Sequence, residues 1–363
     1  MKILFLNSAH SKYPIGSDPW VQATVYAIKK FAEKNNTVVC STEPSPWSLT
    51  TYLAGTLGLN IELIVRHSEN GEGKKAFNDI LENYNFDCSR TQPHFIQQLS
   101  GKKLTEKATW QIRDRVALEL ADVIYPISVR PGGRLDKLLQ DNKIEPKVNN
   151  DFRIEWSRGG DRPSYRFKNR IINSLHGDWL IHWTCASPGP WPGEKSWQFY
   201  RDLLTNPDTY VRSAGATLAR IVNEECVRGS SWKISGDDPA VAFTAQSIAE
   251  ALPLMRWRKR FVRYTFEPYG IAVKKSALID FGAREVSYEQ IELSDNKPDK
   301  LFIHAPGEIT DWSLEKEWRV PGDLPFDKIN KHDMIVIVPE KRDRNIYFQR
   351  VKQDIPVHVI FGE

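Results

Sequence analysis

Residues 1–65 alternate short apolar runs with amphipathic segments, and this alternation constrains the fold more than any other feature of the chain. The apolar runs predict strands and the amphipathic segments predict helices. In chain order the elements are a strand at 2–8, a helix at 19–34, a strand at 37–41, a helix at 47–57 and a strand at 61–65. Such alternation is typical of a parallel α/β sheet with right-handed crossovers. Ligands bind beyond the carboxyl ends of the strands in these sheets, so we expect them at the loops 9–18 and 42–47.

The segment 112–139 continues the pattern with a helix, a strand at 123–129, a Pro-Gly-Gly turn at 131–133 and a second helix. This order resembles the Rossmann-like nucleotide-binding family that contains the lysine-decarboxylase-like phosphoribohydrolases and related nucleotide sensors. There an arginine-bearing helix precedes an Ala-Asp pair, a strand and a Pro-Gly-Gly-x-Gly-Thr-x-x-Glu turn. The chain departs from this motif where the family has glycine, threonine and the catalytic glutamate, because those positions hold Leu135, Asp136 and Leu139.

The resemblance implies that the N-terminal half binds a nucleotide-like ligand without hydrolysing it by the family's route. Glycines let backbone amides at a helix N-terminus approach a phosphate, and arginines pair with it. The predicted ligand residues are Arg113, Arg115, Arg130, Gly132, Gly133 and Asp18. Asp18 is also expected to cap the helix that begins at Pro19. A surface or helix-capping charge explains each arginine as well, and that alternative stays open.

The chain has 363 residues, longer than most single hydrophobic cores, which predicts two domains. Residues 71–107 are polar, and we expect one helix there, at 74–84, inside long connections. Between 143 and 178 the periodic pattern weakens while glycine, proline and charge accumulate. The predicted organisation is a Rossmann-like domain at 1–150, a linker at 151–178 and a second domain at 179–363. The basic and aromatic residues of the linker also suit a nucleic-acid contact.

Charge and cysteine content exclude several classes of protein. A formal net charge of +4 is too small to identify a nucleic-acid-binding protein by itself. The four cysteines are far apart in the sequence and form no Cys-x-x-Cys pair, so neither a disulfide framework nor a metal site is expected. The first apolar run is too short for a signal peptide or a membrane span. We therefore expect a cytoplasmic protein with reduced thiols and no membrane contact.

The second domain opens with an apolar run at 179–185 in which His182 and Thr184 alternate, so a strand places both on one face. A histidine in such a run is commonly a core residue. Helices are predicted at 197–204, at 214–225 and up to residue 252, and strands at 240–244, 264–273, 286–288, 301–304, 314–319 and 334–338. This mixture predicts an α+β domain.

Near the C-terminus Glu315 and Glu317 are two residues apart in a run of alternating character. A strand there places both carboxylates on one face. Because like charges repel, one carboxyl group is expected to be partly protonated or poised for catalysis. An edge strand with two solvated charges is the alternative.

Residues 179–338 resemble the ADP-ribosyltransferase superfamily in the order of their elements. The matching features are the His-x-Thr strand, the helix pattern at 218–229, a Phe-Thr strand, a Gly-Ile-Ala strand after a tyrosine, a Val-x-Tyr strand and the late Glu-Lys-Glu-Trp-Arg motif. That last motif is similar to the ending of the bacterial abortive-infection-type branch. The resemblance implies that NAD is a substrate. Cleavage of its nicotinamide–ribose bond builds an oxocarbenium-like cation, which a carboxylate beside the ribose stabilises.

In this interpretation Glu317 stabilises the cation and Glu315 activates the acceptor as a general base. His182 and Thr184 hydrogen-bond the ribose hydroxyls. Arg319 either pairs with the diphosphate or holds the two glutamates.

Tyr264 and Tyr269 are the candidates for stacking on nicotinamide, although core positions explain both as well. Close to them lies a basic cluster around Trp257, which suits either a nucleic-acid acceptor or a solvated helix face. Its basic residues are Arg256, Arg258, Lys259, Arg260 and Arg263.

The predicted activity is transfer of ADP-ribose from NAD to a nucleic acid or a protein, or hydrolysis of NAD, under the control of a nucleotide-sensing domain. The resemblance places such an activity in bacterial defence against phage. One alternative is a nucleoside or nucleotide N-glycosidase that uses the N-terminal domain, against which Leu139 argues. Another is a non-enzymatic nucleic-acid-binding protein, indicated by the basic clusters and the twelve tryptophans.

Overall fold

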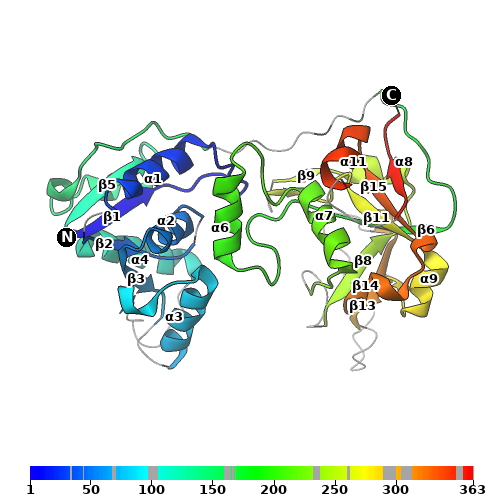
Figure 1. Ribbon diagram of the computed structural model, residues 1–363, viewed down its shortest axis with the longest axis horizontal. Helices are drawn as coiled ribbons and strands as arrows, with labels where there is room; N and C mark the ends of the chain where they lie inside the picture. The colour runs from blue at the N-terminus through cyan, green and yellow to red at the C-terminus, as the bar shows by residue number, and fades with distance from the viewer. Residues whose placement is uncertain are drawn as a thin grey trace. The chain divides into compact units, whose positions relative to one another are not determined.

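The computed structural model describes residues 1–32, 35–43, 45–67, 71–96, 105–158, 165, 167, 169–231, 238–259, 262–288, 300–303, 313–348 and 355–362. The chain forms two compact units, which can be followed by colour along the sequence in Figure 1. Unit 1 consists of Met1–Pro163 and Pro188–Val211, and unit 2 of Ser164–Ser187 and Arg212–Glu363. No helix within the described ranges is long and apolar enough to cross a membrane.

Unit 1 is built on a five-stranded parallel sheet, and the strand–helix alternation at the start of the chain predicts such a sheet correctly. In the spatial order of the sheet the strands are β4 (Thr91–Phe95), β3 (Asn60–Val65), β2 (Thr37–Cys40), β1 (Lys2–Asn7) and β5 (Val123–Ser128). β1 pairs with both β2 and β5. The chain therefore builds the sheet outward from β1 on one side and then returns to add β5 on the other.

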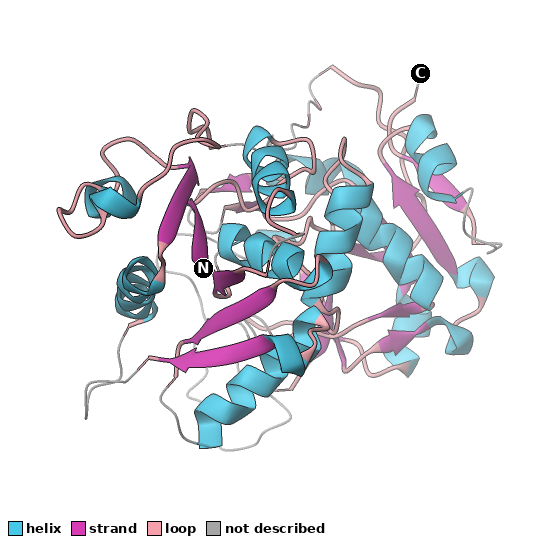
Figure 2. Ribbon diagram, turned by 60° about the vertical axis from the view of Figure 1, so that its left-hand side comes forward, coloured by secondary structure: helices cyan, strands magenta, loops and turns pink. Residues whose placement is uncertain are grey.

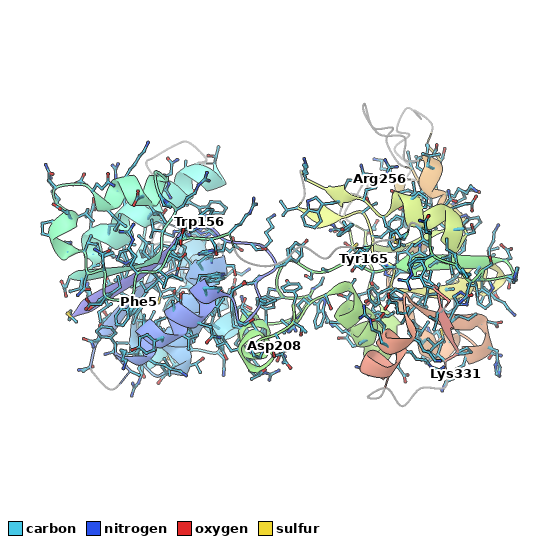
Figure 3. The ribbon with its side chains drawn as sticks, turned by 90° about the horizontal axis from the view of Figure 1, so that it is seen from above. Phe5, Trp156, Tyr165, Asp208, Arg256 and Lys331 are labelled. Atoms are coloured by element: carbon cyan, nitrogen blue, oxygen red, sulfur yellow. The ribbon has the colours of Figure 1, made fainter. Side chains whose placement is uncertain are left out.

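Helices cover both faces of this sheet. Ile3 and Phe5, the latter labelled in Figure 3, point into one core cluster, and Leu4 and Leu6 point into another. Because a strand covered on both faces buries most of its positions, β1, β2, β3 and β5 are mainly apolar. The helices of unit 1 are α1 (Pro19–Lys29), α2 (Ser45–Thr56), α3 (Gly71–Tyr84), α4 (Glu106–Leu120), α5 (Arg134–Leu139) and α6 (Ser196–Thr205).

β4 is a strand that the sequence pattern does not predict, since we expected a long connection after residue 84. It lies at the edge of the sheet and pairs with β3, which leaves Gln92 and Pro93 exposed. An edge strand tolerates proline because one row of its backbone groups faces solvent. Because β4 is mostly polar, it cannot be predicted from apolar runs in the sequence.

The structure divides the chain at positions other than the predicted boundaries near 150 and 178. Phe152, expected in the linker, packs on unit 1, where its ring centre lies 5.1 Å from that of Tyr125. Helix α6, expected in the second domain, also belongs to unit 1 and buries Tyr200 and Leu203 in the same core. An amphipathic pattern shows that a helix has a buried face but does not say which core buries it.

Unit 2 is built on a mixed seven-stranded sheet, and the helix and strand segments of both units are distinguished in Figure 2. In spatial order the strands are β12 (Arg284–Glu285), β13 (Glu317–Pro321), β8 (Ala240–Thr244), β6 (Trp179–Trp183), β11 (Gly270–Lys274), β15 (Met334–Val338) and β16 (Val357–Val359). Neighbouring strands are antiparallel except for the parallel pair β15–β16. The helices are α7 (Ala214–Glu224), α8 (Ile248–Ala251), α9 (Lys275–Asp280) and α11 (Lys341–Phe348).

Two predicted strands of unit 2 differ in the structure. The strand predicted at 286–288 lies slightly earlier, as β12, and that predicted at 301–304 is a single bridge between Ser287 and Ile303, with residue 304 outside the described residues. Two short antiparallel pairs form separate two-stranded sheets. They are β9 (Trp257–Arg258) with β10 (Arg263–Tyr264), and β7 (Cys226–Val227) with β14 (Leu324–Pro325).

The centre of the large sheet is weakly paired between β6 and β8. These strands share one residue pair, Ile181 with Thr244, whereas β6 pairs with β11 along its whole length. Beyond that pair the imidazole of His182 takes the place of a strand partner, because its Nδ1 lies 2.8 Å from the carbonyl oxygen of Ala242. The two strands therefore separate at His182, and a cavity opens there.

Candidate active site

The cavity at this separation has a volume of about 650 Å³ and lies within unit 2. We call it the β6–β13 cavity, after the strands that carry His182 and Glu317. Its walls come from β6, β8 and β13 and from the hairpin β9–β10. The ionisable residues that line it are His182, Cys185, Arg228, Arg258, Arg263, Tyr264, Glu315, Glu317 and Arg319.

Glu317 and Arg319 form a two-point ion pair in the wall of the cavity. Glu317 Oε1 accepts from Arg319 Nε at 2.8 Å and Oε2 accepts from Arg319 Nη2 at 3.1 Å. Arg319 is almost completely buried, and its Nη1 donates to the carbonyl oxygens of Leu301 (2.6 Å) and Ile303 (3.4 Å). A planar guanidinium held in this way fixes the carboxylate that it faces. Of the two roles considered for Arg319, its contacts support holding a glutamate.

The expected alternation of Glu315 and Glu317 along one strand is wrong. β13 begins at Glu317, whereas Glu315 ends a short 3-10 helix, Ser313–Glu315. Lys316, between them, has a φ of 43°, which breaks the strand and costs a non-glycine residue about 1–2 kcal/mol. The turn is tied to β8, because Thr244 Oγ1 donates to the carbonyl oxygen of Glu315. Both glutamates still line the cavity, but from two separate elements.

His182 lines the cavity as a neutral imidazole. Because a carbonyl oxygen only accepts, Nδ1 carries the proton that binds Ala242 O, and Nε2 is left as an acceptor. Burial lowers the pKa of His182 below its usual 6.5, and the hydrogen bond to Ala242 opposes this shift only in part. The ring is therefore uncharged at physiological pH.

Neither Thr184 nor Tyr269 lines the cavity, which contradicts the role predicted for Thr184 and agrees with the alternative of a core position for Tyr269. Thr184 is buried, and its hydroxyl lies within hydrogen-bond distance of the carbonyl oxygens of Ala214 (2.9 Å) and Tyr269 (3.1 Å). Tyr269 packs on the core of unit 2, and its hydroxyl donates to Asp343 Oδ1 at 3.3 Å. Both side chains hold elements of the fold together.

Tyr264 does line the cavity, but it is also a core residue. It is buried, and its ring packs edge-on against Tyr165 and Trp257, with ring centres 5.3 Å apart in both pairs. Tyr165 in turn donates to Glu267 Oε2 at 2.5 Å, and burial raises the pKa of Glu267. These contacts fix the base of the β9–β10 hairpin.

The basic cluster is a hairpin, so the alternative of a solvated helix face is wrong. Arg258 of β9 pairs with Arg263 of β10, and both side chains line the cavity. Arg258 Nε donates to Thr265 Oγ1 at 3.0 Å. Arg256, labelled in Figure 3, and Lys259 flank β9 and are exposed. Arg260 lies outside the described residues.

Cys185 also lines the cavity, with its thiol in the protonated form. Burial raises the pKa of its thiol to about 12, although the nearby Arg263 side chain lowers it in part. A thiol with such a pKa stays protonated at physiological pH and reacts poorly. The carboxylates, the imidazole and the arginines of the cavity are therefore the candidates for a chemical role.

Two residues at or next to the cavity were not among the predicted site residues. Arg228, which follows β7, lines the cavity and forms ion pairs with Glu224 (3.1 Å) and Asp323 (3.7 Å). Tyr288 accepts a hydrogen bond at its Oη from the backbone N–H of Glu317 (3.1 Å), and burial raises the pKa of Tyr288 to about 12. The Val-x-Tyr motif was the signal for Tyr288, and Arg228 lies in the segment 218–229 that the resemblance uses, although it was not singled out as a site residue.

No family model, curated protein or solved structure matches this chain. The residues of the β6–β13 cavity themselves indicate its chemistry. They combine a fixed carboxylate, a neutral imidazole and several arginines on elements that are far apart in the sequence.

Most of the ligand residues predicted in unit 1 make contacts within the fold. Arg113 of α4 is buried, where it pairs with Asp114 and donates to the carbonyl oxygens of Thr42 and Glu43. Its guanidinium also lies 4.5 Å from the centre of the Trp47 ring. Arg115, two residues further along, is exposed. Arg113 therefore has a structural role, in line with the alternative reading of the arginines.

The Pro-Gly-Gly turn has the expected shape but not a vacant anion site. Gly132 has a φ of 65°, a conformation that favours glycine, and its N–H donates to Asp136 Oδ2 at 2.9 Å. Asp136 thus places a carboxylate where the resemblance predicts a phosphate. Gly133 is the N-cap of α5, and the guanidinium of Arg130 lies 5.5 Å from the ring centre of Trp156.

Asp18 occupies the predicted N-cap position of α1 but does not cap the helix with its side chain. Its Oδ2 accepts from the backbone N–H of Ile15 at 3.1 Å, within the preceding loop. The carboxylate stabilises the loop, and Pro19 starts the helix as expected.

Gly270 of β11 sets the distance between β11 and the strand that carries His182. A Cβ atom at this position would lie 2.6 Å from the carbonyl oxygen of His182 and 3.0 Å from Cε3 of Trp183. We expect Gly270→Ala to lower the free energy of unfolding by about 1–3 kcal/mol, measured by urea denaturation. Gly362→Ala is the matched control, because its Cβ would meet no atom closer than 3.6 Å. Equal midpoints for both variants would contradict this account of Gly270.

Proposed function

We propose that unit 2 cleaves the nicotinamide–ribose bond of NAD and transfers ADP-ribose to an acceptor or to water. The observation that carries this proposal is the meeting of His182 and Glu317 at one cavity, with the carboxylate of Glu317 held by the buried Arg319. These are the residue types and motifs on which the resemblance to the ADP-ribosyltransferase superfamily rests. The cavity volume falls in the usual range for ligand sites, roughly 300–1,000 Å³.

The proposed reaction breaks one C–N bond and forms one C–O bond. Nicotinamide leaves with the bonding electron pair as a neutral molecule, and the ribose carbon becomes an oxocarbenium-like cation. The carboxylate of Glu317 stabilises that charge electrostatically. His182 Nε2 accepts a hydrogen bond from a ribose hydroxyl, and Glu315 takes the proton of the attacking hydroxyl or water. Arg319 acts as a positioning residue for Glu317.

The positive side chains of the cavity support an anionic substrate and acceptor. Arg258 and Arg263 place two guanidinium groups of the hairpin in its wall, where they suit the diphosphate of NAD. The exposed Arg256 and Lys259 next to them extend positive charge outward, which favours a nucleic acid over a neutral acceptor. Binding of such an acceptor should weaken steeply as salt concentration rises.

The direct test supplies NAD labelled on the adenylate phosphate together with DNA, RNA or cell lysate. Release of nicotinamide with label on a polymer supports transfer and identifies the class of acceptor. Release of nicotinamide without labelled polymer supports hydrolysis. The proposal fails if NAD stays intact under all of these conditions.

The pH profile of NAD turnover tests the role of His182. Because the pKa of His182 lies below 6.5, Nε2 stays unprotonated and can accept a hydrogen bond as the pH falls to 6.5. Protonation removes this acceptor only in more acid solution. We expect kcat/KM to be constant between about pH 8 and 6.5 and to fall below pH 6.5. Replacement by glutamine, His182→Gln, should remove this acid limb, with circular dichroism as the control for folding at each pH. A limb that persists unchanged in the variant would exclude His182 as its origin.

A further inference from the structure

The loop that follows β1 contains a histidine packed against two tryptophans of unit 1. His10 is only 9% exposed, and its ring is parallel to that of Trp20 in the first turn of α1, with ring centres 4.6 Å apart and planes inclined by 4°. The ring centre of Trp156, a residue labelled in Figure 3, lies 6.2 Å from that of His10. The loop, helix α1 and the segment around Trp156 therefore meet at this histidine.

Two hydrogen bonds fasten residues 156–158 to this loop. His10 Nδ1 lies 2.8 Å from the carbonyl oxygen of Ser157. The next residue of the loop, Ser11, donates its backbone N–H to the carbonyl oxygen of Arg158 at 2.7 Å. Because a carbonyl oxygen only accepts, Nδ1 carries the proton of the neutral ring. The segment that is held in this way lies near the end of the first stretch of unit 1.

A second proton on the His10 ring is disfavoured by its surroundings. That proton would bind Nε2, which is buried and has no hydrogen-bond partner within the described ranges of the chain. A buried N–H without an acceptor is destabilising, and a buried charge is more so. Burial lowers the pKa of His10 below its usual 6.5, although the carbonyl groups of Ser157 and Arg158 and the carboxylate of Asp18 oppose the shift in part. The closed contact therefore favours the neutral ring.

The charged groups around the ring support the same conclusion. Asp18 is the acidic group that acts on His10, and its Oδ2 already accepts from the backbone N–H of Ile15 at 3.1 Å. An indole face attracts a cation, but the guanidinium of Arg130 already lies 5.5 Å from the ring centre of Trp156. A positive charge on His10 would therefore be added next to a cation that is already in place.

We propose that His10 is a pH-sensitive latch, in which the neutral ring fastens residues 156–158 to the loop after β1 and the protonated ring releases them. Release frees three residues, which adds about 10 Å of extended chain to the stretch that leads from unit 1 to unit 2. The proposal concerns unit 1 and does not depend on the chemistry proposed for unit 2.

The direction of the pH effect follows from the burial of the ring. Because the pKa of His10 in the closed latch lies below 6.5, the stabilisation by the latch is complete above about pH 6.5 and is lost as the pH falls below that value. The released ring is solvated and titrates near its ordinary pKa of about 6.5. At about pH 5, protonation can therefore favour release by at most about thirtyfold.

The test measures amide hydrogen exchange of the full chain at about pH 7.5 and about pH 5, with each rate divided by the intrinsic exchange rate at that pH. We expect protection of the Ser11 N–H, which donates to Arg158, to fall about tenfold in acid. The N–H of Ile154 is the internal control, because it donates to the carbonyl oxygen of Ile127 upstream of the latch and should stay protected. The proposal is overturned if protection of Ser11 is the same at both pH values, or if Ile154 loses protection to the same extent.

One variant with a matched control assigns the effect to His10. His10→Phe keeps a flat ring against Trp20 but cannot titrate, so protection of Ser11 should be lower overall and equal at the two pH values. His67→Phe, the same change at an exposed histidine of unit 1, should keep the pH dependence of the wild-type protein. Circular dichroism checks that both variants are folded. A pH dependence that persists in His10→Phe overturns the proposal, and if this variant does not fold, the comparison of Ser11 with Ile154 in the wild-type protein decides it.

Discussion

NAD turnover by the Glu317→Gln protein is expected to fall by about 100-fold to 1,000-fold. Glutamine keeps the size of the side chain but removes the negative charge beside the developing cation. It also leaves the buried positive charge of Arg319 without its counter-ion, which further disfavours a cation in the cavity. Release of nicotinamide from labelled NAD measures the effect directly.

The matched control for this variant is Glu285→Gln, the same chemical change at an exposed residue of β12 outside the cavity lining. It should leave turnover unchanged. Glu315→Gln separates the two proposed roles, because loss of a general base should reduce transfer to the acceptor more than it reduces loss of nicotinamide. Wild-type turnover by a folded Glu317→Gln protein would remove Glu317 from the mechanism.

Arg319→Met is expected to lower the free energy of unfolding by about 3–5 kcal/mol, measured by urea denaturation. The substitution keeps an unbranched side chain but removes every donor that holds Glu317 and the carbonyl oxygen of Leu301. The Glu317 side chain is only 15% exposed, so its charge would remain largely buried without a partner. An uncompensated buried charge is the main source of the cost.

The double variant Glu317→Gln/Arg319→Met tests this reason, because a neutral amide tolerates burial better than a carboxylate. It should be more stable than Arg319→Met alone. Arg342→Met is the surface control: Arg342 is 76% exposed in its pair with Glu340, and its loss should cost less than about 1 kcal/mol. If both single arginine variants unfold at the same urea concentration, the ion pair of Arg319 contributes little to stability.

The fold was predictable where burial leaves a simple pattern. β1, β2, β3 and β5 are mainly apolar because helices cover both faces of their sheet, so the sequence marks each of them. β4 was not predicted because an edge strand can contain exposed polar residues, and it can contain a proline, which has no backbone N–H to donate. The unit to which α6 belongs was not predictable, since its apolar face fits either core.

The candidate site was predictable in its residue types rather than in its geometry. His182, Glu315, Glu317 and Arg319 were all singled out, and all line one cavity. The left-handed backbone of Lys316, which separates the two glutamates, has no sequence signal because lysine has no preference for positive φ. The catalytic roles of these residues stay predictions. The sequence could not show that the N–H groups of Arg319 donate to Glu317 and to backbone carbonyl groups, because those contacts are made only in the folded chain.

The interleaved composition of the two units has a consequence for how the protein is made. Helix α6 completes the core of unit 1. The last residue of unit 1, Val211, follows the first stretch of unit 2, Ser164–Ser187, in the sequence. On the ribosome the sheet of unit 1 therefore emerges complete while the helix that buries part of its core is still being synthesised. We expect a nascent chain that stops between these points to expose apolar surface that α6 covers in the folded unit, and to need protection from aggregation until residue 211 has left the exit tunnel.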